Sequence, residues 1–243
     1  MRRKQTVNMA LNDVPPDCDF KMDFETIATF RARPRMDVAA VASELTSIGR
    51  WFYQQKWVLG TSGNFSAVLS REPFRMLITA SGVHKGTMTP DNFLQVDSSG
   101  KAIGGKQHPS AEMLIHLTII SELNAGSILH THSVWGTILS EAHAVSGGLM
   151  IQGYEMLKGL SGIRTHEYEE WLPILENSQD YTELSKSLSL VLREKPGIHG
   201  FLLRNHGLYT WGSNIEEAKR HVEIFEFLLE VIGRRQTITS SIP

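Results

Sequence analysis

Two histidines separated by a single residue, His130 and His132, carry the strongest chemical signal in this sequence. They follow the apolar residues Ile128 and Leu129, a pattern typical of a buried strand, in which residues i and i+2 point from the same face. A third histidine, His206, follows another apolar stretch. Three imidazole nitrogens with one open coordination position are typical of a catalytic metal site. We therefore predict a site for Zn²⁺ or a similar ion, with strand histidines satisfied by hydrogen bonds as the alternative.

Three segments upstream of the histidine pair are suited to an anion. The turn at residues 60–64 contains two glycines, so its backbone N–H groups can point at an oxyanion without an intervening side chain. Residues 79–86 add hydroxyls, another glycine turn and a lysine, and Ser110 is expected at the N-terminus of a helix, where phosphate is favoured. Glycine and serine turns are usually only turns. Three of them ahead of a histidine pair nevertheless predict a phosphate pocket near a metal.

The bulk composition excludes several classes of protein. With 243 residues and 41% hydrophobic content, the chain can bury one substantial core, so a single folded domain is the default. A net charge of −2 gives no electrostatic reason to expect nucleic acid or an anionic membrane as a partner. The single cysteine, Cys18, supports neither a disulfide framework nor a thiolate metal site. No apolar run approaches the roughly 20 residues of a membrane span, so we expect a soluble, cytoplasmic protein.

The first 35 residues differ in their sequence pattern from the rest of the chain. Residues 1–35 have weak periodicity and are predicted to form a poorly ordered N-terminal extension, ahead of a folded catalytic domain over residues 36–243. The apolar patterns and capping residues of that domain predict five helices and a set of short strands. The first helix is expected from about residue 37 and ends in the loop at 60–64, and the other helices are expected at about 109–123, 135–142, 181–194 and 214–233. The strands are expected at 65–69 and 76–79, in the apolar run from 128 that leads into the histidine pair, and at 200–204 and 209–211. This alternation indicates an α/β fold with a mixed or antiparallel sheet covered on both faces.

Taken together, five short stretches of this sequence resemble the class II aldolase/adducin family, in the family's order and over roughly residues 37–235. The stretches are Gly63-Asn64-Phe65-Ser66, Thr79-Ala80-Ser81-Gly82, Pro109-Ser110-Ala111-Glu112, His130-Thr131-His132 and Asn205-His206-Gly207. The resemblance implies a three-layer α/β/α domain with a mainly antiparallel central sheet. It also implies a homo-oligomer, usually a tetramer, with sites near subunit boundaries.

The same resemblance implies roles for individual residues. His130, His132 and His206 would be the ligands of one Zn²⁺ per subunit. The implied contacts to the phosphate of a small phosphorylated ketose are Asn64, Ser81, Gly82, Ser110 and Lys85. Neither nucleic acid nor a membrane is expected as a partner.

Within the family, residues 152–159 decide between branches. In the sugar-phosphate aldolases of the family, the corresponding position looks like a tyrosine. In this chain the position is Glu155, followed by Met-Leu-Lys-Gly, and this stretch resembles a dehydratase branch of the family. The resemblance thus implies zinc-dependent dehydration of 5-methylthioribulose 1-phosphate to 2,3-diketo-5-methylthiopentyl 1-phosphate in methionine salvage. Such a reaction needs one group that accepts a proton and donates another, which a carboxylate with a raised pKa can do. Glu155 is the predicted acid/base, and a surface glutamate in a loop is the alternative.

The positions of two further residues, Glu112 and His116, also predict their roles. Glu112 is expected near the metal without the main catalytic role, or else as a carboxylate in the first turn of a helix. His116 lies four residues later in a very apolar stretch, which favours a hydrogen-bonded core histidine over a metal ligand. The rival functions are a sugar-phosphate aldolase or pentulose-phosphate epimerase, and a non-catalytic adducin-like module. Intact His130, His132 and His206 argue against the module.

Overall fold

The structure is a computed structural model that describes residues 37–240. The N-terminal extension predicted for residues 1–35 lies outside the described residues. Within the described range, no helix is both long and apolar enough to pass through a lipid bilayer.

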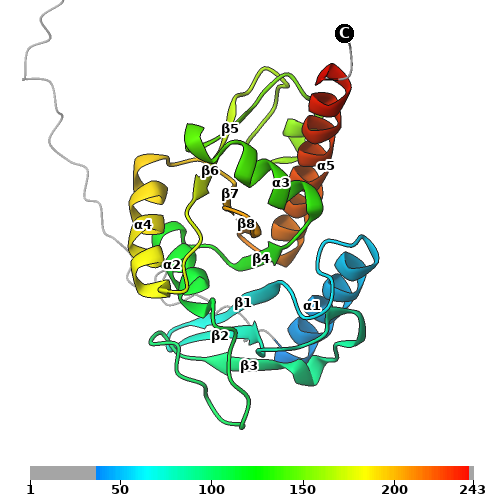
Figure 1. The fold of residues 1–243 in the computed structure, drawn as a ribbon. Coiled ribbons are helices and arrows are strands. Elements are labelled where there is room, and N and C mark those ends of the chain that lie inside the picture. The colour runs from blue at the N-terminus through cyan, green and yellow to red at the C-terminus, as the bar shows by residue number, and fades with distance from the viewer. Residues whose placement is uncertain (1–36, 241–243) are drawn as a thin grey trace, which may run out of the picture. The chain divides into compact units, whose positions relative to one another are not determined.

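One eight-stranded sheet forms the middle of the described domain (Figure 1). Its spatial order is β3-β2-β1-β4-β8-β7-β6-β5, and of these neighbouring pairs only β6 with β7 is parallel. The sheet is therefore mainly antiparallel, as predicted. The strands are β1 (Asn64–Arg71), β2 (Phe74–Thr79), β3 (Phe93–Val96), β4 (Ser127–Thr131), β5 (Gly148–Ile151), β6 (Glu170–Leu175), β7 (Gly200–Leu203) and β8 (Gly207–Gly212).

Five α-helices cover the two faces of the sheet and complete the predicted α/β/α layers (Figure 1). They are α1 (Val38–Gln54), α2 (Met113–Leu123), α3 (Val134–Ala142), α4 (Tyr181–Glu194) and α5 (Ile215–Ser240). Helices α2 and α4 share an apolar cluster with one face, while α1, α3 and α5 pack on the other. Short 3₁₀ turns lie at η2 (Lys85–Thr87), η3 (Pro90–Asn92), η4 (Ala144–Ser146) and η5 (Glu155–Gly159).

Side-chain caps start the helices where the sequence indicates. Asp37 accepts a hydrogen bond from the Ala39 N–H at the start of α1, and Ser133 and Asp180 do the same for α3 and α4. Each cap satisfies a backbone donor that lacks a partner in the first turn. Helix α5 extends beyond the predicted end at residue 233.

The helix predicted from residue 109 begins later, at Met113. Residues 109–110 do not join the helix, because they pair with the end of β2, and residues 111–112 form a turn that leads into it. Pro109 bridges Ala80, and the Ser110 N–H donates to the Thr79 carbonyl at 3.2 Å. Ser110 therefore precedes the helix instead of capping it, and a long-range backbone contact overrides the local helix signal.

Strand alternation sets the location of the functional site. In β4, Ile128 belongs to the apolar cluster beneath α2 and α4, whereas Leu129 belongs to the cluster beneath α1. His130 shares the face of Ile128 because side chains repeat every two residues. Across the ladder, His130 pairs with Tyr209 of β8. The histidine pair thus leaves the sheet at the end of β4, on the side of α2.

Candidate active site

The three predicted histidines converge at the end of β4. The Nε2 atom of His132 lies 2.8 Å from that of His130 and 3.1 Å from that of His206, and the remaining Nε2 pair is 3.3 Å apart. Nitrogen ligands about 2.0–2.1 Å from a tetrahedral metal lie about 3.3–3.4 Å from one another. The two spacings to His206 are close to that value and the His130–His132 spacing is shorter, so the three ligand atoms are near enough to one another to hold one metal ion.

The hydrogen bonds of the Nδ1 atoms of His130 and His206 support a role of these histidines as metal ligands. The Nδ1 atom of His130 lies 2.9 Å from the Leu208 carbonyl oxygen, which can only accept, so Nδ1 carries the hydrogen and Nε2 has a free lone pair. His206 Nδ1 lies 3.3 Å from Oδ1 of Asn177. Second contacts of this kind orient metal-binding imidazoles. Burial lowers the pKa of His130 well below its usual range and that of His132 to about 3, so both are neutral, the form that binds a metal.

Local backbone geometry brings His206 to the other two histidines. It lies in the tight turn between β7 and β8, where Asn205 has φ of 55°, a conformation that asparagine tolerates better than most residues. A Cβ atom on Gly207 would lie 1.9 Å from the Thr131 carbonyl oxygen. Only glycine lets this turn approach β4 so closely, and that approach places the third imidazole.

Glu112 lies beside the three imidazoles, close to where the sequence analysis expected it. Its Oε2 is 3.4 Å from Nε2 of His130, and its Oε1 is 3.2 Å from Nε2 of His206. The Tyr209 hydroxyl donates to Oε2 at 2.6 Å, and the Tyr209 ring stacks on His130 with centroids 3.8 Å apart. Sequence reasoning missed Tyr209, because its position opposite His130 follows from the pairing of strands far apart in the chain.

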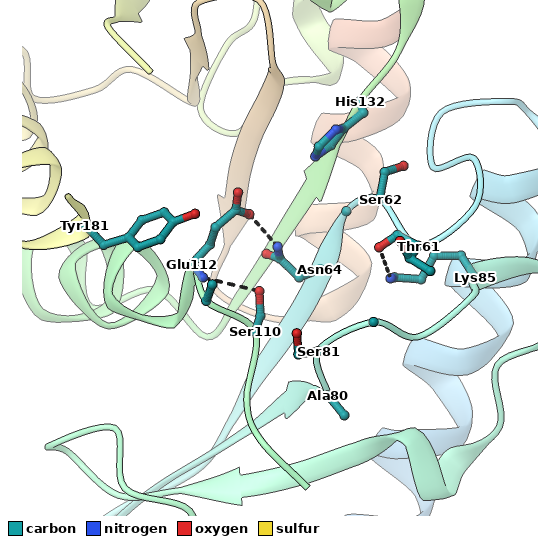
Figure 2. Close-up of a pocket in the computed structure, with 13 residues that line it drawn as sticks. Thr61, Ser62, Asn64, Ala80, Ser81, Lys85, Ser110, Glu112, His132 and Tyr181 are labelled. Carbon is teal, nitrogen blue, oxygen red and sulfur yellow. Dashed lines mark hydrogen bonds between the residues drawn. The ribbon is translucent and has the colours of Figure 1, made fainter. Parts of the chain in front are cut away.

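A cavity of about 310 Å³ opens beside this cluster (Figure 2). It brings together His132, Glu112 and every residue predicted to contact phosphate. The cavity is lined by Thr61, Ser62, Gly63, Asn64, Ala80, Ser81, Gly82, Lys85, Ser110, Ala111, Glu112, His132 and Tyr181. Tyr181 begins α4, and its hydroxyl points toward the Glu112 side of the cavity in Figure 2. The sequence carries no signal that this helix start faces the site.

Lys85 supplies the positive charge of the cavity. The side chain is buried, and its Nζ donates to the carbonyl oxygens of Val83 at 2.8 Å and Thr61 at 3.2 Å. No carboxylate of the described residues lies within ion-pair distance of Nζ. Burial lowers the pKa of Lys85 to about 8, and the charge of Glu112 opposes that shift. An anion in the cavity would provide the missing counter-charge.

Glu155, the predicted acid/base, does not line this cavity in its own chain. It begins the turn η5, its side chain is 68% exposed, and it forms an ion pair with Lys158. His166 Nδ1 lies 3.6 Å from its carboxylate. The hydrogen bond from Lys158 lowers the pKa of Glu155, whereas the predicted acid/base role calls for a raised pKa. The structure therefore brings the other predicted residues together within one chain, but not this one.

His116 is a buried, hydrogen-bonded core residue, as expected. Its Nδ1 lies 2.7 Å from the Ser66 hydroxyl, and its Nε2 lies 2.5 Å from Oδ1 of Asn64. It is absent from the cluster of metal-ligating atoms among the described residues.

Comparisons with known proteins agree with this geometry. The sequence profile described as Class II Aldolase and Adducin N-terminal domain matches residues 43–232. A methylthioribulose-1-phosphate dehydratase from Methylococcus capsulatus is 40% identical over 194 residues, 79% of this chain and 93% of that protein. A protein of the same name from Pseudoalteromonas translucida is 42% identical over 198 residues, 81% of this chain and 92% of that protein.

Solved structures show the same fold at lower identity. An L-fuculose 1-phosphate aldolase has a TM-score of 0.70 with 21% identity, over 84% of this chain and 90% of that one. YgbL from Escherichia coli, described as a putative aldolase/epimerase/decarboxylase, has a TM-score of 0.68 with 23% identity, over 80% of this chain and 89% of that one. The profile match spans most of the chain and carries the three histidines that converge in the structure. The chain belongs to the class II aldolase and adducin family.

Proposed function

We propose that this chain is a zinc-dependent hydro-lyase that converts 5-methylthioribulose 1-phosphate to 2,3-diketo-5-methylthiopentyl 1-phosphate. The observation that carries the proposal is the identity of about 40% to proteins named methylthioribulose-1-phosphate dehydratase, over more than nine-tenths of their length. The cavity also supports the proposal. The candidate metal centre lies beside a cationic, hydroxyl-rich pocket, and a small ketose phosphate needs both to bind.

The hydroxyl-rich end of the cavity would hold the substrate phosphate. Ser81 and Ser110 offer hydroxyl donors, Gly82 leaves the backbone accessible, and the Lys85 ammonium supplies charge. Charge-assisted hydrogen bonds of this kind bind phosphate more strongly than neutral ones. With the phosphate there, the substrate chain extends toward the imidazoles and Glu112.

His130, His132 and His206 would hold the zinc ion. Neutral, buried imidazoles with directed Nε2 lone pairs are a suitable donor set for Zn²⁺. When bound, the ion would supply Lewis acidity at the substrate carbonyl and so acidify the adjacent C–H bond.

Proton transfer is the part of the reaction that we assign to Glu155. Its carboxylate takes the proton from C3, which is adjacent to the C2 carbonyl of the substrate. It then returns a proton to the C4 hydroxyl, which leaves as water and takes the C4–O bonding pair with it. The resulting enol becomes the 2,3-diketone by moving its hydroxyl proton to C4, so the overall change is the loss of one water molecule.

For Glu155 to reach the substrate, we propose that it acts in the cavity of a neighbouring subunit. Its high exposure and its absence from the cavity of its own chain support this arrangement. We also propose a homotetramer with cyclic symmetry. Such symmetry repeats the same subunit boundary, and therefore the same position of Glu155, at each active site. It also places the enzyme in the cytoplasm and in methionine salvage.

Product analysis tests the function directly. Incubation of the purified protein with Zn²⁺ and 5-methylthioribulose 1-phosphate should yield a diketone with a mass 18 Da lower than that of the substrate, which is the mass of water lost. An aldolase on the same scaffold would instead release dihydroxyacetone phosphate and a shorter aldehyde, and an epimerase would leave the mass unchanged. Either of these results, or no turnover in the zinc-loaded protein, contradicts the proposal.

A further inference from the structure

A carboxyl group, that of Glu226, lies in the apolar face that helix α5 packs against the sheet. Val222, Phe225 and Leu229 beside it are fully buried, and Glu226 itself is only 3% exposed. Among the described residues, no lysine, arginine or histidine lies within ion-pair distance of this carboxyl group. Burying a carboxyl group without a charged partner costs free energy that an apolar side chain would not cost. Packing alone therefore does not explain a glutamate at this position.

The hydrogen-bond partner of Glu226 is Thr131, the residue between His130 and His132. Oγ1 of Thr131 donates to Oε1 of Glu226 at 2.5 Å, and both side chains are buried. Burial raises the pKa of Glu226 to about 7, as expected for a carboxyl group that water does not reach. Helix α5 packs against β4 (Figure 1), and side chains alternate along a strand, so Thr131 points toward α5 while His130 points toward α2. The bond thus holds the histidine segment from the face opposite to the His130 imidazole.

Thr131 is the last residue of β4, so the bond acts where regular strand pairing stops. The backbone of Thr131 still pairs with Leu208 of β8, whereas the N–H of His132 donates to the Trp57 carbonyl oxygen at 2.7 Å. A β-branched side chain has few χ1 conformations, so fixing the Thr131 hydroxyl also restrains the backbone beside it. That backbone determines the distance between the Nε2 atoms of His130 and His132, which is 2.8 Å.

We propose that Glu226 is a positioning residue for the candidate metal centre, because its bond to Thr131 fixes the strand end that carries His130 and His132. Glu226 itself belongs neither to the cavity lining nor to the cluster of metal-ligating atoms. The inference rests on the proposed function only in treating the three histidines as ligands of Zn²⁺. It predicts that zinc affinity depends on an acceptor at position 226 and a hydroxyl at position 131, although neither group binds the ion.

A matched pair of substitutions at Glu226 separates the hydrogen bond from the charge. Glu226→Gln keeps an oxygen acceptor at the same reach and should retain zinc affinity within about twofold of the parent. Glu226→Leu removes the acceptor and should weaken zinc binding about 10-fold, the lower end of the effect of losing a group that supports metal ligands. Zinc affinity is measured by competition with a chelator on the purified full chain, so the readout does not depend on turnover.

A second pair tests the same bond from the side of the donor. Thr131→Ser keeps the hydroxyl and should retain zinc affinity, whereas Thr131→Val keeps the shape and should lose about 10-fold. Glu230→Leu is the control on the same helix, because Glu230 is 46% exposed and pairs with Arg234 instead of the strand. The control should bind zinc as the parent does.

The double variant Thr131→Val/Glu226→Leu distinguishes positioning from simple stabilisation. Replacing both partners of a buried hydrogen bond with apolar groups is nearly neutral or stabilising, so the metal-free Tm should equal or exceed that of the parent. Zinc affinity should nevertheless stay about 10-fold below the parent, no lower than in the single variants, because all three proteins lack the same bond. This variant keeps the test decisive even if a single variant with an unpaired buried group fails to fold.

Several outcomes would overturn the inference. If Glu226→Gln binds zinc as weakly as Glu226→Leu, the carboxyl group acts through its charge and not through Thr131. If the double variant binds zinc as the parent does, or if Glu230→Leu loses as much affinity, the bond does not position the ligands. A parent protein without bound zinc would overturn both this inference and the proposed function. If the parent binds zinc and the variants behave as stated but the substrate is not dehydrated, only the proposed function is wrong.

Discussion

The Nδ1 hydrogen of His130 is donated to the Leu208 carbonyl oxygen at 2.9 Å, so the Nε2 lone pair of this ring is directed at the other imidazoles of the cluster. A neutral histidine that donates through one nitrogen can only accept or bind a cation through the other. The bond to Leu208 thus fixes the ring in the tautomer that a metal ion requires.

Replacing His130 should abolish metal binding and metal-dependent stability together. His130→Ala removes one of three ligands, so elemental analysis should show about one zinc per parent chain and almost none in the variant. A ligand present at a thousand times its Kd stabilises the folded state by about 4 kcal/mol. Chelator should therefore lower the Tm of the parent and leave that of the variant unchanged.

His143→Ala is the matched control for this experiment. His143 is the C-cap residue that follows α3, and its ring contacts Gln236 rather than the histidine cluster. The control should bind zinc and respond to chelator as the parent does. If His130→Ala retained stoichiometric zinc, the three-histidine site would be wrong.

Local sequence signals predicted most of the fold. Caps and apolar periodicity located α1, α3 and α4, and alternation located the β1–β2 hairpin. The strands β3, β5 and β6 were missed because they are short or carry unfavourable residues. In β6, Pro173 cannot donate to the ladder, and Glu170 is a buried charge whose partner, His199, is distant in sequence.

The metal ligands of the candidate site could be predicted from the sequence, whereas the residues that surround Glu112 could not. The spacing of His130 and His132 indicates a shared face, and a glycine after His206 indicates a tight turn. The positions of Tyr209 and Asn64 around Glu112 depend on the order β1-β4-β8, which no local pattern encodes. Contacts that depend on the pairing of strands far apart in the chain can be identified only from the folded structure.

Lys85 should control phosphate binding and its pH dependence. Lys85→Met removes the charge and keeps the apolar stem, so the affinity for inorganic phosphate should fall by about 10–100-fold, as for the loss of a hydrogen bond to a charged group. Burial lowers the pKa of Lys85 to about 8. Phosphate binding to the parent should therefore weaken as the pH rises above about 8, because the ammonium loses its proton.

Calorimetric titration with phosphate between pH 7 and pH 9.5 tests this dependence. Lys85→Met should lack the decline that the parent shows. Lys101→Met, which removes an exposed lysine, should behave like the parent. A decline of equal size in all three proteins would show that Lys85 is not the titrating group.

His199 should stabilise the protein most strongly in acid. Burial lowers its pKa, but hydrogen bonds to Glu170 and to the Ser161 carbonyl outweigh burial, so the pKa is raised overall. A group whose folded pKa exceeds its unfolded pKa stabilises the fold below the unfolded value and loses that contribution as pH rises through the folded value. His199→Gln should reduce the free energy of unfolding by about 3–5 kcal/mol at pH 6 and by less at pH 9.

The comparison with His221→Gln checks the sign of this effect. His221 accepts the Ser161 N–H, and burial lowers its pKa to about 4, so it is neutral throughout this pH range. Its contribution should be constant from pH 7 to pH 9, whereas that of His199 should shrink. Urea unfolding at fixed zinc concentration measures both. A contribution from His199 that grew with pH would contradict the assigned protonation.

Subunit mixing should reveal whether Glu155 acts across a boundary. Glu155→Gln and His130→Ala should each be inactive as pure proteins, because one lacks the proton-transfer group and the other a zinc ligand. In mixed oligomers, an intact histidine cluster can face an intact Glu155 of a neighbour. Random equimolar mixing in a cyclic tetramer should restore about one quarter of the sites. Activity is measured after joint refolding, with native mass spectrometry to establish that the oligomers are mixed.

A second mixture provides the control that makes this result decisive. His130 and His206 converge within a single chain, so mixing His130→Ala with His206→Ala can never rebuild a complete cluster. That mixture should stay inactive, even in oligomers shown to contain both variants. If the first mixture is equally inactive, Glu155 does not act from a neighbouring subunit. Activity in both mixtures would point to contamination with the parent protein instead of a shared site, because three ligands from one chain cannot be assembled from two defective copies.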